Sequence, residues 1–416
     1  MKIKSTLSEW LHHIQNLHAQ PIDLGIERVR HVAMVLNLLT PASIIFTVAG
    51  TNGKGTTCRA IELILLASGY QVGVYNSPHL MHYNERIRIR GREVTEEELI
   101  TSFSVVDMGR KNISLTYFEF GTLSALWLFR EAKLDIVILE VGLGGRLDAT
   151  NIVDADIAII TSIALDHTTW LGSDRESIGR EKAGIFRTGK PAVVGDPGMP
   201  NSIRKVAQYI GAKLHQRNRD WSYSVTGNSW EFEDVNGKIS FIPLPKIPID
   251  NAATAIAAVR ISPIKVHDAM IRDILPQAAL PGRFQIVSKS PWVILDVAHN
   301  PHAAHYLSKQ LKKIKQYAKI HAIVGMRQDK DISNTLNYLV PQIDYWYCAS
   351  LTQPRGSSAV HIMSYLKKAM CFKSVSNAWH YALENANSRD IIIVFGSFYT
   401  VSEVMTARLA TYTSIF

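Results

Sequence analysis

The sequence of 416 residues has only three cysteines and lacks any long apolar run. Cys58, Cys348 and Cys371 lie far apart and form no Cys-x-x-Cys pair, which disfavours a disulfide framework or a zinc site. A membrane-spanning helix needs about 20 consecutive apolar residues, and the segment from Met1 to Trp10 is too polar for a signal peptide. We therefore expect a protein of the reducing cytoplasm with no membrane partner.

Positive charge is in excess but is not gathered into one block. The formal net charge of +9 at pH 7 would suit either nucleic acid or anionic small molecules such as ATP. The sequence has no basic stripe interleaved with aromatic residues, which is typical of proteins that bind single-stranded nucleic acid. We therefore expect no nucleic-acid partner. A nucleic-acid-binding NTPase is the alternative from another functional class, and ATPase activity stimulated by DNA or RNA would support it.

Three common catalytic signatures are also missing. The chain has no Gly-x-Ser-x-Gly motif, and no Cys/His pair can be argued from its spacing. The stretch Gly142-Leu-Gly-Gly145 loosely resembles a dinucleotide fingerprint but lacks the third glycine at the right spacing. These absences disfavour hydrolysis by a serine nucleophile and hydride transfer.

A glycine-rich stretch from Gly50 to Thr57 is the strongest motif that is present. It follows the β-branched run at 44–48 and precedes a helical pattern at 58–68 that Gly69 can end. Backbone N–H groups at such a strand–turn–helix junction bind anions, helped by the helix dipole. Lys54 adds a positive charge for phosphates, and Thr56 can reach Mg²⁺. The early glycine of the standard phosphate loop is missing, and Gly55 lies between the lysine and the threonine. An ordinary tight turn is the alternative interpretation.

Polar residues follow several other predicted strands at the point where each strand stops. Ser77 follows the strand at 72–75, Glu140 lies in the strand at 135–141, and His167 follows the strand at 156–161. The carboxyl ends of parallel strands share one edge of a sheet, and ligands bind there. We therefore expect these residues and the glycine-rich loop to lie close together.

The alternation of strands and helices predicts an α/β fold with two domains. Apolar strands alternating with helices indicate a mostly parallel sheet with helices on both faces. Short alternating pieces from Trp221 to Pro245 predict a small antiparallel β segment. We expect an N-terminal P-loop NTPase-like, ATP-binding domain over 1–280, a linker over 281–289 and a Rossmann-like α/β domain over 290–416. The stretch 85–90 alternates polar and apolar residues, which predicts a strand with one wet face.

Several candidate residues have a plainer interpretation as well. Glu140 could ligate Mg²⁺, which prefers oxygen ligands, or could accept N–H groups of the glycine-rich turn after it. For His167 alone, a structural or hydrogen-bonding function is favoured over metal ligation. Lys182 could be a solvated lysine on a helix face, or a desolvated one with a lowered pKa that can be modified. Asn300 is explained as a helix N-cap before Pro301.

Eight motifs together resemble the folylpolyglutamate synthases of the wider Mur ligase group, and most closely the bifunctional dihydrofolate synthase/folylpolyglutamate synthases. The resemblance covers nearly the whole chain. The motifs are Gly50-Thr-Asn-Gly-Lys-Gly-Thr56, Ser77-Pro-His-Leu80, Leu115-Thr-Tyr-Phe118, Glu140-Val-Gly-Leu-Gly-Gly-Arg-Leu-Asp148, Leu165-Asp-His167, Arg180-Glu-Lys-Ala-Gly-Ile-Phe186, Leu280-Pro-Gly-Arg-Phe284 and Asp296-Val-Ala-His-Asn-Pro301.

The resemblance implies an ATP-dependent ligase that joins L-glutamate to 7,8-dihydropteroate and to the glutamate tail of reduced folates through an acyl phosphate. The expected cofactor is Mg²⁺, as two ions, with ATP as co-substrate and K⁺ as an optional further cation. The expected partners are small molecules only, and we expect a monomer. The first domain would be the Mur ligase-like ATP-binding domain, and the second the glutamate ligase domain.

The resemblance also implies sets of site residues. The ATP site would comprise Gly53, Lys54, Gly55, Thr56, Thr57, Asn251, Arg283 and Asp296. The metal ligands would be Thr56, Ser77, Glu140 and His167. The pterin or folate site would comprise Asp23, Leu24, Thr116, Phe118, Arg146, Leu147 and Asp148. His299 and Ser397 would contact glutamate. The catalytic residues would be Lys54, His167 and Lys182, with Lys182 modified to N6-carboxylysine.

Two alternatives lie within the same superfamily. The protein could extend folates without dihydrofolate synthase activity, and activity on dihydropteroate discriminates the two. It could instead ligate a peptidoglycan precursor, but the first forty residues and the segment from Leu115 to Phe118 speak against that.

Overall fold

The computed structural model describes residues 4–315 and 318–413. The chain divides into two compact units, unit 1 over Met1–Ala279 and unit 2 over Leu280–Phe416. Each unit has its own sheet and its own apolar core. Residues 285–289, which the sequence analysis assigned to a linker, form the first strand of unit 2. Among the described residues, every helix is too short or too polar to span a bilayer.

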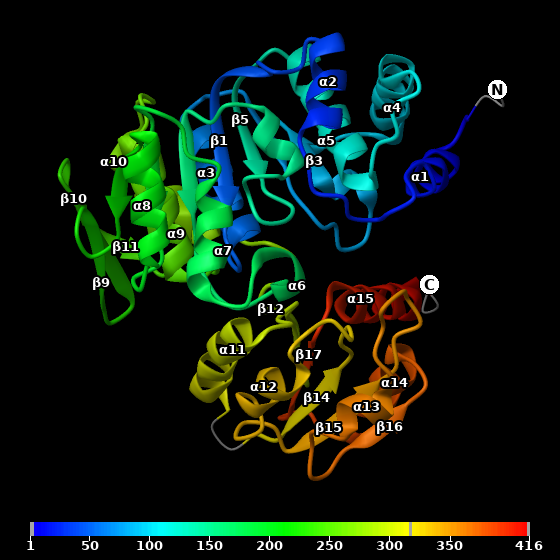
Figure 1. The fold of residues 1–416 in the computed structure, drawn as a ribbon. Coiled ribbons are helices and arrows are strands. Elements are labelled where there is room, and N and C mark those ends of the chain that lie inside the picture. Colours follow the sequence, from blue (N-terminus) through cyan, green and yellow to red (C-terminus); the bar gives the residue numbers. More distant parts are fainter. Residues whose placement is uncertain (1–3, 316–317, 414–416) are drawn as a thin grey trace. The chain divides into compact units, whose positions relative to one another are not determined.

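Unit 1 is built on an eight-stranded sheet, of which Figure 1 labels β1, β3 and β5. The strand order is β4-β3-β2-β5-β1-β6-β7-β8. The run from β2 to β8 pairs in parallel, whereas β3 pairs antiparallel with both β2 and β4. The strands are β1 (Ala42–Ala49), β2 (Val72–Tyr75), β3 (Ile87–Ile89), β4 (Arg92–Glu93), β5 (Leu134–Glu140), β6 (Ile157–Ile160), β7 (Pro191–Val194) and β8 (Lys213–Gln216).

The central strands are buried because helices cover both faces of the sheet. Phe46 and Val48 of β1 pack on one side with α3 (Lys54–Ala67) and α9 (Ile249–Ile261). Ile45 and the alternate residues of β5 pack on the other side. That side is covered by α1 (Leu7–Gln15), α2 (Glu27–Val35), α4 (Glu96–Arg110), α5 (Tyr117–Glu131), α7 (Arg175–Ala183) and α8 (Asn201–Ile210). This arrangement confirms the mostly parallel sheet with helices on both faces.

Local sequence signals place the helix ends in unit 1. Thr95 and Glu98 form the capping box of α4, and Thr116 and Glu119 form that of α5. Gly69 follows the C-cap of α3 with a φ of 89°, a conformation that favours glycine. The shorter helices are α6 (Thr168–Leu171), η1 (Tyr83–Arg86), η2 (Ala149–Ile152) and η3 (Leu275–Gln277).

A separate three-stranded antiparallel sheet is attached to unit 1. Its strands are β9 (Trp221–Thr226), β10 (Ser229–Asp234) and β11 (Gly237–Pro243). The buried rings of Trp221, Trp230 and Phe232 pack into the same core as α9. The helix α10 (Asp268–Ile274) contacts both β11 and α3. The predicted antiparallel segment is therefore confirmed.

The predicted strand at 85–90 is shorter than expected, and its polar face is not wet. Residues 83–86 form η1, and the strand begins at Ile87. Arg86 is 8% exposed and its guanidinium lies over the rings of Tyr83 and Tyr117. The side chain of Arg88 is 12% exposed because it pairs with a carboxylate of α3. The alternation of polar and apolar residues was therefore predicted correctly, but the predicted solvent exposure of the polar residues was wrong.

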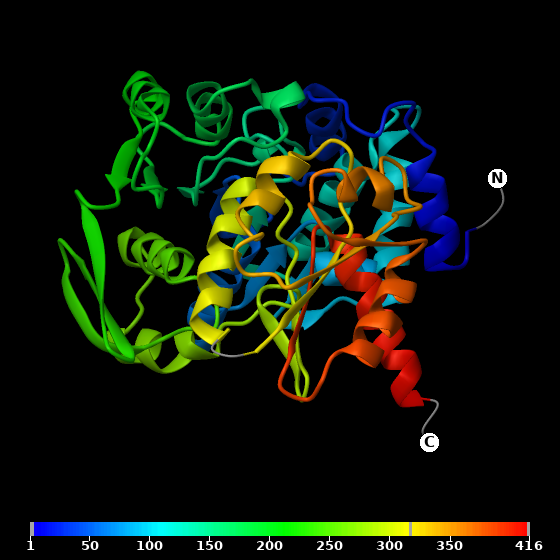
Figure 2. The ribbon, with the colours of Figure 1, turned by 90° about the horizontal axis from the view of Figure 1, so that it is seen from below.

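Unit 2 is a second, smaller α/β layer structure with the strand order β12-β13-β17-β14-β15-β16. Only the pair β12–β13 is antiparallel. Helices α11, α12 and α13 cover one face of the sheet and α14 and α15 the other (Figure 1 and Figure 2). The strands are β12 (Gln285–Lys289), β13 (Trp292–Leu295), β14 (Ile320–Val324), β15 (Tyr345–Ala349), β16 (Met370–Phe372) and β17 (Ile391–Phe395). The helices are α11 (Pro301–Ile314), α12 (Ile332–Asn337), α13 (Ala359–Met363), α14 (Val375–Asn385) and α15 (Phe398–Thr413).

Candidate functional site

Four adjacent strands of unit 1 end at the candidate site. The order β2-β5-β1-β6 places their carboxyl ends side by side at one edge of the sheet. The predicted polar residues follow these strands: Ser77 after β2, Glu140 at the end of β5, Lys54 after β1 and His167 after β6. The expected convergence at one sheet edge is therefore present.

Two glycines allow the loop after β1 to make its tight turn. Gly53 has a φ of 87°, and a Cβ there would lie 2.4 Å from Oδ1 of Asn251. A Cβ on Gly50 would lie 1.8 Å from the hydroxyl oxygen of Thr161 on the neighbouring chain segment. Real side chains cannot occupy either position without moving these neighbours. The loop is therefore held close to α9 and to the end of β6.

The first turn of α3 presents backbone N–H groups that no side chain caps. Gly53 is the N-cap residue and has no side chain to accept them, unlike Thr95 and Thr116 in the other helices. Such N–H groups, together with the helix dipole, favour an anion. Lys54 adds an ammonium, which donates to the carbonyl of Gly50 at 3.1 Å. The loop can therefore bind a phosphate group.

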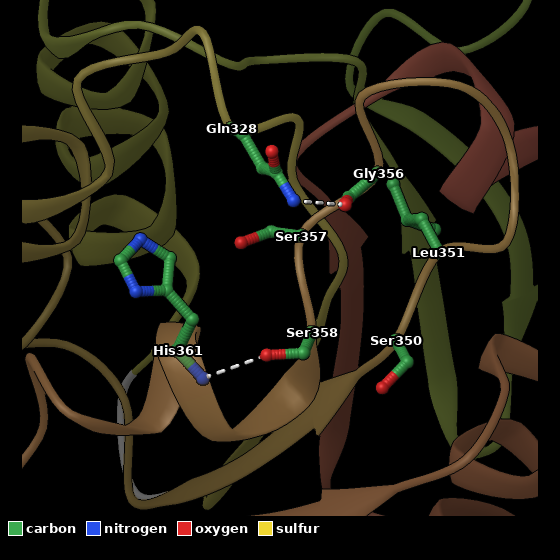
Figure 3. Close-up of a pocket in the computed structure, with 7 residues that line it drawn as sticks. All are labelled: Gln328, Ser350, Leu351, Gly356, Ser357, Ser358 and His361. Carbon is green, nitrogen blue, oxygen red and sulfur yellow. Dashed lines mark hydrogen bonds between the residues drawn. The ribbon is translucent and has the colours of Figure 1, made fainter.

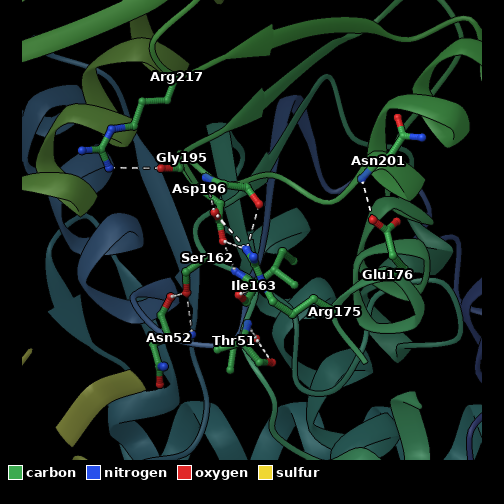
Figure 4. Close-up of polar contacts among 12 residues, drawn as sticks. Thr51, Asn52, Ser162, Ile163, Arg175, Glu176, Gly195, Asp196, Asn201 and Arg217 are labelled. Carbon is green, nitrogen blue, oxygen red and sulfur yellow. Dashed lines mark hydrogen bonds and ion pairs between the residues drawn. The ribbon is translucent and has the colours of Figure 1, made fainter. Parts of the chain in front are cut away.

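Hydrogen bonds to the segment after β6 hold the other half of the loop (Figure 4). The backbone N–H of Asn52 donates to the hydroxyl of Ser162 at 3.1 Å, and that hydroxyl donates to the carbonyl of Asn52 at 3.0 Å. The Thr51 hydroxyl accepts from the N–H of Ala164 and donates to its carbonyl, at 3.0 and 3.1 Å. The two segments therefore form one hydrogen-bonded unit.

An ion pair fixes the segment after β6 in turn. The Asp196 carboxylate accepts the N–H of Ile163 at 2.7 Å and pairs with Arg175 at 3.1 Å. Arg175 also donates to the carbonyl of Ile163 at 3.0 Å. Figure 4 shows both side chains converging on Ile163. The sequence analysis missed these two residues because their function depends on contacts between distant segments.

Lys182 is the most perturbed cation of the site. It is 4% exposed, and its ammonium donates to the same Gly50 carbonyl as Lys54, at 3.1 Å. Burial and the nearby charge of Lys54 lower the pKa of Lys182 to about 7, and Asp166 and Asp148 oppose this shift. A large part of the lysine is therefore the neutral, nucleophilic amine near neutral pH. The interpretation as a solvated lysine on a helix face is wrong.

The oxygen atoms at the sheet edge fit a magnesium ion. The Thr56 hydroxyl donates to the carbonyl of Gly53 and accepts from Asn251 at 2.8 Å, which leaves one lone pair. The Glu140 carboxylate accepts the N–H of Ser77 at 3.1 Å through Oε2. Within the described part of the chain, no three His, Cys, Asp or Glu side chains gather as a preformed metal centre. One carboxylate and a few hydroxyls are typical of Mg²⁺ sites that phosphates and water complete.

His167 lies at the N-cap of α6 with a φ of 52°, an uncommon conformation for a residue with a side chain. Its backbone N–H donates to the carboxylate of Asp166 at 2.9 Å, and its imidazole lies 3.9 Å from the same carboxylate. The strained backbone and the acidic neighbour suit a residue held for a specific contact.

The predicted pterin residues occupy the same end of unit 1. Asp23 pairs with Arg28 at 2.6 Å, and Arg28 also pairs with Glu119 at 3.0 Å. Glu119 and Thr116 together form the capping box of α5. The Phe118 ring stacks on Tyr75 with a centroid separation of 5.7 Å.

The turn after β5 adjoins this aromatic pair. A Cβ on Gly142 would lie 2.6 Å from the Phe118 ring, so the turn passes directly over it. Asp148 is buried, and burial raises its pKa although the N–H groups of Leu143 and Thr150 oppose the shift. Arg146 is exposed and pairs with Glu181 at 3.0 Å, whereas Leu24 and Leu147 are half-buried. Phe118 therefore packs between this turn and the fully buried ring of Tyr75. The sequence analysis missed Tyr75, and it also missed Arg28, which pairs with Asp23 and Glu119.

The predicted residues of unit 2 gather at the carboxyl ends of β13 and β17. Asp296 is half-buried and accepts the N–H groups of Phe284 and Ala298, both at 2.8 Å. The Arg283 guanidinium lies 4.9 Å from the centre of the Phe398 ring. These contacts hold the start of the unit against the end of β13.

His299 and Ser397 lie on the two chain segments that follow these strands. The His299 ring contacts the carbonyl of Val297 at 2.9 Å, and the Ser397 hydroxyl contacts that of Thr400 at 2.8 Å. The N–H of Gly396 donates to the carbonyl of Ala298 at 3.0 Å, so the two segments are adjacent. Asn300 caps α11 as predicted.

A pocket lies at the carboxyl ends of β14 and β15 in unit 2 (Figure 3). Its lining residues are Gln328, Ser350, Leu351, Gly356, Ser357, Ser358 and His361. None of them belongs to the predicted site, and the pocket contributes nothing to the interpretation of that site.

Comparison with known proteins agrees with this geometry. Residues 48–259 match the family of the Mur ligase middle domain, and residues 282–398 match the Mur ligase, glutamate ligase domain. The dihydrofolate synthase/folylpolyglutamate synthase of Escherichia coli K12 is 57% identical over 401 residues, which covers 96% of this chain and 95% of that protein.

Solved structures are similar over the whole chain. The structure of E. coli FolC in complex with DHPP and ADP has a TM-score of 0.97 and 56% identity, and covers 99% of this chain and 100% of that one. A bifunctional folylpolyglutamate synthase/dihydrofolate synthase with Mn, AMPPNP and L-glutamate bound has a TM-score of 0.94 and 56% identity, over 98% of this chain and 99% of that one. The chain belongs to the dihydrofolate synthase/folylpolyglutamate synthase family of Mur ligases.

Proposed function

We propose that the protein ligates L-glutamate to 7,8-dihydropteroate, giving dihydrofolate, and to the glutamate tail of reduced folates, giving folylpolyglutamates. ATP drives both reactions. The observation that carries this proposal is the convergence of Lys54, Thr56, Ser77, Glu140 and His167 at one sheet edge, in a chain that is 57% identical to an enzyme of that name.

The reaction joins a carboxylate and an amine in two steps. A carboxylate oxygen of the pteroate or folate attacks the γ-phosphorus of ATP, the bond to the bridging oxygen breaks, and ADP leaves. The amine of glutamate then attacks the carbonyl carbon of the acyl phosphate, loses a proton and expels inorganic phosphate. Both steps depend on neutralising phosphate charge and on positioning rather than on a protein nucleophile.

The residues of the glycine-rich loop suit the phosphate-binding part of this task. The loop residues from Gly53 to Thr57 would hold the triphosphate, through the uncapped N–H groups at the start of α3 and the Lys54 ammonium. Asn251 would contact ATP from α9, where it also orients the Thr56 hydroxyl at 2.8 Å. Arg283 and Asp296 would contribute further ATP contacts.

Thr56, Ser77, Glu140 and His167 are proposed as the ligands of a divalent cation, with Mg²⁺ as two ions in the full site. A bound cation neutralises charge that develops on the transferred phosphoryl group. The similar structures hold Mn, ADP or AMPPNP, which supports the use of a divalent metal with an adenine nucleotide. K⁺ stays an optional further cation.

Lys182 is proposed to carry a carboxyl group as N6-carboxylysine. The neutral amine attacks the carbon of CO₂ and loses a proton, which gives a carbamate anion. The ammonium groups of Lys54 and Lys182 share the Gly50 carbonyl and repel each other. Carbamate formation turns the Lys182 group into an anion, which removes this repulsion.

Substrate contacts are proposed from the remaining residues. Asp23, Leu24, Thr116, Phe118 and the turn from Arg146 to Asp148 would bind the pterin or folate. His299 and Ser397 would bind the incoming glutamate. One similar structure holds DHPP and another holds L-glutamate. We further propose that the enzyme acts as a monomer in the cytoplasm.

A labelling experiment tests the proposed chemistry. Dihydropteroate carrying ¹⁸O in its carboxylate is incubated with ATP, Mg²⁺ and L-glutamate. The acyl-phosphate route predicts that one ¹⁸O atom appears in the released phosphate. Ligation that leaves all the label in the amide product and water would contradict this route.

A further inference from the structure

A chain of buried polar side chains leads from α3 to the Glu140 carboxylate. The strands β2 and β5 pair in register, with Tyr75 beside Leu139, so the next residues along them are Asn76 and Glu140. Arg88 of β3 is paired with Val74 of β2 and lies on the α3 side of the sheet with Asn76. The strands β2, β3 and β5 therefore bring polar side chains together beside the candidate metal ligand.

Both hydrogen bonds to the Glu140 carboxylate fall on the same oxygen atom. Nδ2 of Asn76 donates to Oε2 at 2.8 Å, and the N–H of Ser77 donates to Oε2 at 3.1 Å. Glu140 is 5% exposed, so its side chain has little freedom to turn. This geometry fixes the carboxylate plane and leaves Oε1 as the oxygen for a cation.

The orientation of the Asn76 amide is fixed by Arg88. Nη2 of Arg88 donates to Oδ1 of Asn76 at 3.1 Å, and a guanidinium can only donate. The amide oxygen must therefore face Arg88, and the amide N–H must face Glu140. The positive charge also polarises the amide, which strengthens its bond to the carboxylate.

Glu62 of α3 anchors Arg88. Its carboxylate is fully buried and accepts Nε of Arg88 at 2.9 Å and Nη2 at 2.7 Å. Arg59 pairs with the same carboxylate at 2.9 Å. Burial raises the pKa of Glu62, but Arg88 and Arg59 lower it by more, so the carboxylate stays ionised. A buried charge that is paired on two sides holds the guanidinium in one place.

We propose that Asn76 and Arg88 are positioning residues, which hold Oε2 of Glu140 so that Oε1 is presented to the divalent cation. This inference rests on the proposed function, since it takes Glu140 to be a metal ligand. Neither residue touches the reacting atoms. Both act through the orientation of the Glu140 carboxylate, as is common for residues next to metal ligands.

Mn²⁺ binding in the presence of ADP tests this inference without turnover. Free Mn²⁺ is measured by electron paramagnetic resonance during a titration of the full chain. We expect Asn76→Ala to weaken Mn²⁺ binding by about 10- to 100-fold, the usual effect of losing such a neighbour. Arg88→Lys, which keeps the charge beside Glu62 but loses the planar fork, should weaken it less.

A double-mutant cycle and a matched variant complete the test. If Arg88 acts through Asn76, adding Arg88→Lys to Asn76→Ala should cause no further loss of Mn²⁺ affinity. Arg260→Lys is the control, because the Arg260 side chain is exposed to a similar extent, 10%, and also pairs with carboxylates, those of Asp234 and Asp268, at 2.9 and 2.5 Å. This control should bind Mn²⁺ as the unchanged protein does.

Several outcomes would overturn the inference. They are unchanged Mn²⁺ affinity in folded Asn76→Ala or Arg88→Lys, additive losses in the double variant, or no Mn²⁺ binding by the unchanged protein with ADP. A different result would contradict only the proposed function. In that case the unchanged protein would not ligate glutamate, but Asn76→Ala would still weaken its Mn²⁺ binding.

Discussion

Lys182 and Lys54 donate to one carbonyl oxygen, that of Gly50, although both are cations. At the scale of single residues, this contact is unfavourable, because two like charges share one acceptor. Burial in α7 and the nearby charge of Lys54 lower the pKa of Lys182, so its ammonium can lose a proton near neutral pH. Its position explains why this lysine in particular is open to modification.

Carbamate formation on Lys182 should increase as the pH rises through about 7. Its pKa is lowered to about 7, so the neutral amine that attacks CO₂ is the minor form below that pH and the major form above it. The measurement is the ¹³C carbamate signal in protein incubated with labelled bicarbonate. Lys182→Met should remove the signal, and Lys190→Met, at a half-exposed lysine, should keep it. A signal that survives in Lys182→Met would contradict the assignment.

Gly53→Ala should damage nucleotide binding in addition to stability. The backbone at Gly53 has a φ of 87°, and the new Cβ would lie 2.4 Å from Oδ1 of Asn251. Gly69→Ala is the matched control, since Gly69 has a φ of 89° and nothing within 4 Å of the new Cβ.

Both alanine variants should lose about 1–2 kcal/mol of unfolding free energy through the left-handed backbone alone. Only Gly53→Ala should also weaken ADP binding, by about tenfold or more, which corresponds to about 1.4 kcal/mol. Denaturant unfolding and ADP titration measure the two quantities. Equal ADP affinity in the two variants would show that the contact between Gly53 and Asn251 does not matter for the nucleotide.

At the scale of elements, the segment after β6 connects α7 and β7 to the glycine-rich loop. Asp196 and Arg175 hold Ile163, and the neighbouring residues Ser162 and Ala164 hold the loop. The ion pair of Asp196 and Arg175 therefore acts on the loop through this segment.

Asp196→Asn should raise the KM for ATP and lower stability by about 1–3 kcal/mol, since it weakens buried charge-assisted hydrogen bonds. Asp156→Asn is the control at the opposite end of the sheet. Asp156 accepts the N–H of Ile45 at 3.0 Å and pairs with Lys190 at 2.8 Å. It should lose stability with an unchanged KM for ATP. A KM for ATP that is unchanged in Asp196→Asn, or raised equally in both variants, would contradict this connection.

Sequence patterns predicted the elements far better than the contacts between them. The strand ends that carry Lys54, Ser77 and Glu140 were predicted because parallel strands share an edge and apolar runs are easy to detect. The exposure of Arg88 was predicted wrongly, because its partner Glu62 lies in a helix that precedes it by some twenty-five residues. Short, half-exposed strands such as β16 give too weak a pattern to be predicted.

At the scale of the whole molecule, each unit has a separate sheet and a separate core. The core of unit 2 is formed by its own helices and strands, among them Leu307, Leu311 and Phe395. A unit of this size and composition satisfies the usual requirements of a domain that folds alone.

A fragment over residues 280–416 should therefore unfold in one cooperative transition and show far-ultraviolet circular dichroism typical of an α/β protein. Leu311→Ala in this fragment should lower its unfolding free energy by about 2–5 kcal/mol, because Leu311 is fully buried. A fragment without a cooperative transition would show that unit 2 depends on the rest of the chain.

The central claim is that one protein adds glutamate to both a pteroate and a reduced folate. The most direct test incubates the unchanged protein with ATP, Mg²⁺ and L-glutamate, with 7,8-dihydropteroate and tetrahydrofolate in parallel reactions, and measures the released phosphate and the products. We predict phosphate release in both reactions, with dihydrofolate formed in one and tetrahydrofolate carrying an added glutamate in the other. Release with tetrahydrofolate alone would limit the protein to folate extension, and no release with either substrate would contradict the proposed function.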